Sequence, residues 1–198
     1  MIKLLGTSHI AKQSIKEIQQ TIENDKPDIV AVELDRHRFY ALLHDQKKQH
    51  LSIKEIRNIG LFGFIFAAIG SYIQEKLGKV VQVKPGEDML TAVKIAKNND
   101  IKIALIDQNI KITLRKISKA FSIKDIFKIF IDIFRSIFFK ERELKKYGLD
   151  SLDLNRVPSK KVIKKVIKAL EERYPTLYYV LVEERNQIMA KNLIRVQE

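Results

Sequence analysis

Apolar residues recur along this chain at two spacings, which predict strands and helices in alternation. Short, mostly apolar runs at residues 2–5, 29–33 and 101–106 are typical of short buried strands. Elsewhere isoleucine, leucine and phenylalanine return every three or four positions, as on one face of a helix. The first helix is expected to begin at Ser14, because Glu17 three residues later completes a capping box. Helices are expected at residues 14–24, 36–48, 52–77 (one or two helices) and 87–98.

The order of these elements predicts an α/β fold. Strands alternating with helices favour a parallel or mostly parallel sheet with right-handed crossovers and helices on both faces. From residue 109 the pattern is entirely helical, so we expect one domain over residues 1–198 with a largely helical insertion at about 109–173. Helices are expected there at residues 109–120, 123–145, 158–173 and 175–195, with residues 147–158 as the best candidate for a linker.

Composition and charge narrow the possible functions. The chain has no cysteine, which excludes disulfide bonds, thiol nucleophiles and cysteine-based metal sites. Its net charge is +13, and residues 101–198 carry 22 basic against 12 acidic side chains. A basic half is typical of proteins that contact nucleic acid or an anionic membrane surface. Lysine alternates here with isoleucine, which is more typical of solvated helix faces, and no RNA-binding signature occurs, so we expect no nucleic-acid partner.

Chemically reactive side chains follow each predicted strand. His9 comes after the first strand, Glu33 ends the second, and Asp107 follows the third. Because the carboxyl ends of parallel strands meet at one edge of a sheet, we expect these three side chains in one cleft. An imidazole among carboxylates is typical of a metal site or of an acid–base pair. A carboxylate buried at the end of an apolar strand, such as Glu33, would need a partner.

Two simpler interpretations of these residues stay open. His9 also fits an ordinary loop position, and Asp107 also fits the cap of the helix that follows it. The remaining histidines lie six and seven positions apart on a polar helix, so they form no ligand pair with helical spacing. We interpret those histidines as surface residues.

Five short motifs occur in order along nearly the whole chain. They lie at residues 6–10 (GTSHI), 27–35 (PDIVAVELD) with Arg38 after it, 85–89 (PGEDM), 106–114 (IDQNIKITL) and 184–186 (ERN). Each motif alone is a weak signal, but the five in this order resemble those of the TraB/PrgY family.

The resemblance implies an activity and a set of site residues. The family resembles the Tiki proteases, which depend on a divalent metal, and is more distantly similar to the erythromycin esterase and ChaN group. By this resemblance His9 and Glu33 would bind Mn, Co or Zn, which would lower the pKa of a bound water. Glu33 would be either a ligand or the general base, and an arginine such as Arg38 or Arg185 would orient a carboxylate or stabilise an oxyanion. The implied catalytic set is His9, Glu33, Arg38, Asp107, Arg185 and Asn186.

The chain departs from the family pattern at three places. Asp88 takes the position of the acid in the third motif, with Glu87 one position early. Gln108 and Asn109 stand where the family has an arginine and a carboxylate. The family's second G-x-x-H motif is not reached before Glu198. By the resemblance, the chain is expected to be the soluble part of a longer protein, on the cytoplasmic face of a membrane that helices beyond residue 198 would span.

Two functions follow as hypotheses. The full-length protein would be a divalent-metal-dependent peptide hydrolase, with this chain alone holding no tightly bound metal and remaining inactive. Alternatively, it would be a non-catalytic protein that sequesters a peptide or small signalling molecule near the membrane. The apolar stretches at residues 61–73 and 123–139 cover more than one helix face, which predicts a homodimer through one of them.

Overall fold

The structure consists of a small sheet and a larger set of helices. The computed structural model describes residues 2–7, 12–44, 53–81, 86–121, 124–125, 128–129, 131–132 and 159–197. The elements among these residues are α1 (Lys12–Asp25), β1 (Ile29–Val32), α2 (Arg36–Leu43), α3 (Ile53–Ile59), α4 (Leu61–Val81), α5 (Glu87–Asn98), β2 (Lys102–Leu105), α6 (Ile110–Ala120), α9 (Lys160–Arg173), α10 (Pro175–Tyr178), the π-helical segment η1 (Tyr179–Glu183) and α11 (Glu184–Gln197).

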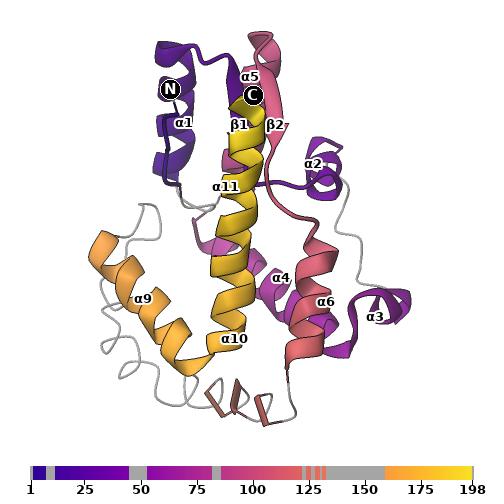
Figure 1. Cartoon of the computed structure of the whole chain (residues 1–198). Helices are drawn as coiled ribbons and strands as arrows, with labels where there is room; N and C mark the ends of the chain where they lie inside the picture. Colours follow the sequence, from indigo (N-terminus) through magenta and orange to yellow (C-terminus); the bar gives the residue numbers. More distant parts are fainter. Residues whose placement is uncertain are drawn as a thin grey trace.

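The two strands β1 and β2 lie side by side and run parallel. Ile29 is opposite Lys102 and Val32 is opposite Leu105, so the two carboxyl ends fall at the same edge of the sheet. The chain between the strands passes through helices α2 to α5, as a parallel pair requires (Figure 1). The predicted α/β class with a parallel sheet is therefore confirmed.

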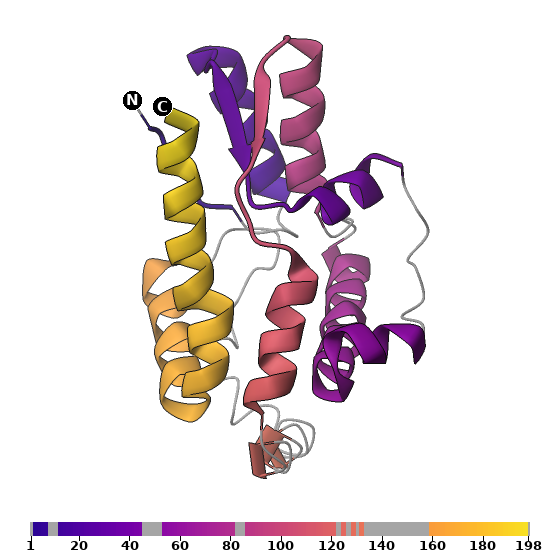
Figure 2. The same cartoon turned by 45° about the vertical axis from the view of Figure 1, so that its right-hand side comes forward.

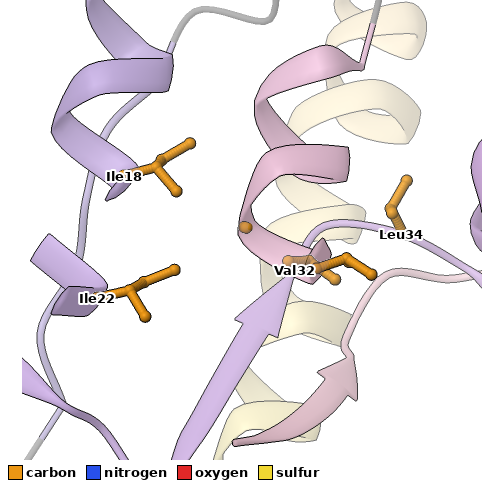
Figure 3. Close-up of a cluster of buried hydrophobic side chains, with 6 residues drawn as sticks. Ile18, Ile22, Val32 and Leu34 are labelled. Carbon is orange, nitrogen blue, oxygen red and sulfur yellow. The ribbon is translucent and has the colours of Figure 1, made fainter. Parts of the chain in front are cut away.

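Helices α1 and α5 pack on each other and on the sheet to form an apolar core. The side chains of α1 point toward β1 at positions four residues apart, as Figure 3 shows for Ile18 and Ile22. Val32 of β1 and Leu34, just beyond the end of the strand, belong to the same cluster, and Ala92 and Val93 complete it from α5. Helix α11 runs along the opposite face of the sheet (Figures 1 and 2). We call α1, β1, α5 and β2 the strand region.

A second apolar cluster holds the other helices together. Ile117 of α6 is 1% exposed and packs with Leu177 of α10 and Val180 of η1. Helices α4 and α6 approach closely at Gly63, where a Cβ atom would come within 2.3 Å of the Leu114 carbonyl oxygen. Glycine therefore sets this contact, because any larger residue would push the helices apart. We call α3, α4, α6, α9, α10 and η1 the helical region.

The structure corrects several expectations. The predicted strand at residues 2–5 is not formed: residues 2–7 lack regular structure, and Ile2 and Leu4 are exposed while Lys3 pairs with Asp25. An apolar run makes a strand only when its backbone finds a ladder partner, and β1 pairs here with β2. Ser14 is not a cap, because α1 already includes Lys12 and Ser14 is buried inside it.

Other predicted elements match the structure or lie outside its described part. The stretch at 52–77 forms two helices, α3 and α4, and the helix expected at 175–195 is divided by η1. Most of the helix expected at 123–145 and the linker expected at 147–158 lie outside the described residues. Within the described part of the chain, no helix combines the length and the apolar character that crossing a membrane requires.

Candidate functional site

The first side chain at the common edge of the sheet is Asp35, just after β1. Its carboxylate accepts hydrogen bonds from the backbone N–H groups of His37 at 2.8 Å and Arg38 at 3.1 Å, which makes it the N-cap of α2. It also accepts from the backbone N–H of Ile110, at the start of α6, at 3.2 Å. Asp35 is only 4% exposed, so it ties two helix ends to the strand from a buried position.

Arg38 connects this aspartate to the end of the second strand. Its Nε donates to Asp35 Oδ2 at 2.7 Å, and its Nη2 donates to Asp107 Oδ2 at 2.6 Å. Burial alone raises the pKa of Asp35, but the hydrogen bonds from Arg38 outweigh it and hold the pKa below its usual range. Burial likewise lowers the pKa of Arg38, but its hydrogen bonds to Asp107 and Asp35 raise it above the usual value.

Arg185 of α11 reaches the same carboxylate from the other face of the sheet. Its Nη2 donates to Asp107 Oδ2 at 2.6 Å and its Nε to Oδ1 at 3.2 Å. The Asp107 side chain is 1% exposed, while those of Arg38 and Arg185 are 30% and 24% exposed. The four residues form a charge-balanced group of two cations and two anions, which we call the arginine–aspartate cluster: Asp35, Arg38, Asp107 and Arg185.

Polar contacts also hold α11 in place around Arg185. Glu184 Oε1 accepts from Lys116 of α6 at 2.6 Å, and Asn192 donates to the carbonyl oxygen of Ile106 at 2.8 Å. The π-helical segment η1 comes directly before these residues. A π-helical turn uses i→i+5 hydrogen bonds and changes the direction of the side chains that follow, and such turns are frequent at functional sites.

The first and third sequence motifs also meet. The Thr7 hydroxyl donates to Asp88 Oδ2 at 3.0 Å, and Asp88 is 1% exposed in the first turn of α5. Gly86, immediately before α5, has φ 82°, a left-handed conformation that glycine adopts at little cost. Asp88, and not the neighbouring Glu87, is therefore the acid that this turn buries.

The structure shows direct contacts among three of the predicted site residues, Arg38, Asp107 and Arg185. Glu33 is exposed, in a tight turn in which the Leu34 N–H donates to the Val32 carbonyl oxygen at 2.8 Å. The expectation that Glu33 needs a buried partner is therefore wrong. Asn186 is also exposed, and His9 lies outside the described residues, so the expected cleft of His9, Glu33 and Asp107 stays a prediction.

Asp107 and Asp35 differ from their expected roles. Asp107 does not cap α6, because Asn109 is the cap and accepts from the Lys111 N–H at 2.9 Å. Asp35 was missing from the implied site set although it anchors the cluster. Its position three residues before Arg38 is the signal, since side chains at that spacing meet on one helix face.

The described carboxylates do not by themselves fit a metal ion. A catalytic divalent metal needs about three protein ligands with free lone pairs. Among the described residues, no three side chains of ligating type gather in one place. Asp107 and Asp35 use their oxygens to accept hydrogen bonds from arginine and backbone N–H groups, whereas Glu33, close to them in the chain, is exposed to solvent.

Comparison with known proteins identifies the family. The profile of the TraB/PrgY/gumN family matches residues 1–198, which is the whole chain. The chain belongs to the TraB/PrgY/gumN family. Residues from all five motifs take part in contacts in this structure, in the Thr7–Asp88 pair and in the arginine–aspartate cluster.

Several known proteins are similar to this chain over all or nearly all of its length. An uncharacterised protein of Methanocaldococcus jannaschii is 36% identical over 198 residues, which is 100% of this chain and 48% of the relative. A human protein named TraB domain-containing protein is 24% identical over 206 residues, covering 93% of this chain and 50% of the relative. The chain therefore spans about half the length of the curated relatives it matches. No solved structure matches significantly.

Proposed function

We propose that this chain supplies part of a peptide-hydrolase domain whose reactive groups are Glu33 and His9. The observation that carries the proposal is the contrast between exposed Glu33 and the buried residues beside it. Leu34 is 3% exposed and Asp35 is 4% exposed, so the backbone that carries Glu33 is fixed on its carboxyl side. A general base requires this combination of a solvent-accessible carboxylate and a fixed position.

In this proposal the arginine–aspartate cluster positions the reactive groups. Asp107 holds the ends of β2, α2 and α11 together through its two arginines. The Nε and Nη2 atoms of Arg38 are used within the cluster, which leaves Nη1, at a partly exposed guanidinium, without a partner among the described residues. Glu33 would accept the proton of an attacking water, and Arg38 Nη1 would donate to the carbonyl oxygen as it gains negative charge.

The proposal is tested by peptide hydrolysis with the full-length protein and a matched pair of variants. Mn²⁺, Co²⁺ and Zn²⁺ are added separately, because the family resemblance implies a divalent metal. Glu33→Gln is expected to lower kcat roughly 100-fold or more, the usual contribution of a general base. Asp28→Asn is the control, since Asp28 is an exposed carboxylate just before the same strand. Equal activities of the two variants would remove Glu33 from the chemistry.

A second candidate is a binding protein without chemistry. It is favoured by Gln108 and Asn109, which replace an arginine and a carboxylate of the family pattern. Both make local structural bonds here: Gln108 Nε2 donates to the Thr113 hydroxyl at 2.9 Å, and Asn109 caps α6. Saturable binding of a peptide that is recovered intact after every metal addition would support this candidate over the hydrolase.

A further inference from the structure

Helix α9 is amphipathic, yet it buries none of its side chains. Helix α1 provides the comparison, because both helices have 14 residues and a strong separation of apolar and polar positions. Helix α1 buries Ser14, Ile18 and Ile22, whereas α9 has no buried residue. The same sequence pattern is therefore used for the core in one helix and is left at the surface in the other.

The exposed apolar residues of α9 lie in its first two turns. Ile163 is 38% exposed and Val166 is 42% exposed, whereas Leu170 one turn later packs against the cluster of Ile117, Leu177 and Val180. Positions three and four apart share one helix face, so Ile163, Val166 and Leu170 form one stripe. The stripe is anchored at its carboxyl end and open at its amino end. Figure 1 shows α9 at the outer edge of the molecule.

Lysines fill the rest of these two turns. The sequence KKVIKKVIKALEER has no acidic residue before Glu171, and the ion pair of Lys168 with Glu172 lies in the last two turns. At 3.6 residues per turn, the apolar residues occupy roughly one half of the circumference and the lysines the other half. The lysines of these two turns are all exposed: Lys160, Lys161, Lys164 and Lys165.

We propose that the first two turns of α9 bind an anionic lipid surface. Ile163 and Val166 would enter the boundary between headgroups and acyl chains, and the flanking lysines would extend to the lipid phosphates and carboxylates. A basic helix with an open aliphatic stripe matches this surface in both charge and polarity. We call the surface formed by Ile163, Val166 and the lysines of these turns the α9 surface.

Two other occupants fit the α9 surface less well. A nucleic acid would use the lysines but would gain little from exposed aliphatic side chains, since bases are bound through hydrogen bonds and stacking. A second copy of the chain would cover the apolar stripe but would bring two sets of lysines together, and like charges at short distance repel. The α9 surface requires no catalysis, so this proposal is independent of hydrolysis at Glu33.

The test is co-sedimentation of the 198-residue chain with vesicles of phosphatidylcholine, with and without phosphatidylserine. Binding is expected only with phosphatidylserine and should weaken as salt is added. Lys161→Gln/Lys165→Gln should raise the lipid concentration for half-binding roughly 25-fold, at about fivefold for each lysine near the surface. Lys12→Gln/Lys16→Gln is the control, since it removes the same charge from exposed, equally spaced positions of α1 and should change this concentration less than about threefold.

A third variant, Ile163→Ser/Val166→Ser, separates a membrane from another polyanion. It should weaken vesicle binding roughly tenfold, because two apolar side chains no longer enter the lipid. Circular dichroism and thermal melting show whether each variant remains folded. Three results would each overturn the proposal: no binding to phosphatidylserine vesicles, equal losses in the α1 and α9 lysine variants, or binding to duplex DNA as tight as to vesicles with no effect of the serine substitutions.

Discussion

The strand region and the helical region bury their apolar side chains in different ways. In the strand region, α1 and α5 place regularly spaced apolar side chains against β1, and the core is closed by residues such as Val93 at 1% exposure. In the helical region, α6 and η1 build a smaller cluster and α9 keeps an open apolar stripe. We therefore expect the core of the strand region to contribute more to stability than the open stripe of α9.

The two regions are connected by hydrogen-bonded charged side chains. The arginine–aspartate cluster connects the carboxyl ends of both strands to α2 and α11, and the Asp35 carboxylate also accepts from the start of α6. Buried ionic groups of this kind are costly to assemble, but they are far more costly to leave half-paired. The arginine–aspartate cluster is therefore the place where a single substitution should separate the two regions most effectively.

The largest effect is expected from Asp107→Ala. This change leaves Arg38 and Arg185 without their shared acceptor, and breaking a buried pair costs about 3–5 kcal/mol. The free energy of unfolding in urea should fall by that amount, with two transitions in place of one if the regions separate. Asp28→Ala removes an exposed carboxylate and should change the free energy by less than about 0.5 kcal/mol. Similar curves for the two variants would contradict a linking role for Asp107.

A pair of isoleucine substitutions compares α1 and α9 directly. Ile22→Ala removes a side chain that is 6% exposed in the strand region and should lower the free energy of unfolding by about 2–5 kcal/mol. Ile163→Ala removes the same atoms from an open position, 38% exposed, and should cost less than about 1 kcal/mol. Equal losses, measured by urea unfolding, would mean that α9 is covered in solution and that the α9 surface is not open.

Two glycines of α4 test how closely the helical region is packed. In Gly63→Ala the new Cβ would come within 2.3 Å of the Leu114 carbonyl oxygen, so the variant should be less stable by about 1–3 kcal/mol. Gly70 has nothing within 4 Å of the same position, so Gly70→Ala should raise stability by about 0.5–1 kcal/mol through helix propensity alone. Thermal unfolding should therefore shift in opposite directions, and shifts of the same sign would contradict the close contact of α4 with α6.

Local sequence patterns predict much of this fold because they report which face of an element is apolar. The runs at 29–33 and 101–106 become β1 and β2, and the isoleucine spacing of α1 correctly indicates its buried face. The run at 2–5 has the same local character and forms no strand, because pairing depends on a distant partner that spacing does not report. Ser14 is not a cap because α1 begins before it and buries it. The spacing of Ser14 and Glu17 does not report that burial.

The sequence also predicts only part of the candidate site: it indicates residues at the strand ends, but not their distant partners. Positions at strand ends correctly indicate where Glu33 and Asp107 fall, because the carboxyl ends of parallel strands share an edge. The partners of Asp107 come from 69 and 78 residues away, and composition and periodicity carry no information on such pairs. The order of family motifs singled out Arg38 and Arg185, but it did not indicate that both would bind one carboxylate.

The smallest effect concerns the contribution of Asp35 to the free energy of unfolding at low pH. The pKa of Asp35 is lower in the folded chain than its ordinary value of 3.8, so the unfolded chain binds more protons between the two values. The stability that Asp35 contributes is therefore complete above about pH 4 and is lost as pH falls through the lower, folded pKa. Asp35→Asn keeps an N-cap acceptor for α2 but removes the titration, so its free energy of unfolding should fall less steeply between pH 5 and pH 2. Parallel losses of stability in wild type and Asp35→Asn would show that other carboxylates govern acid unfolding.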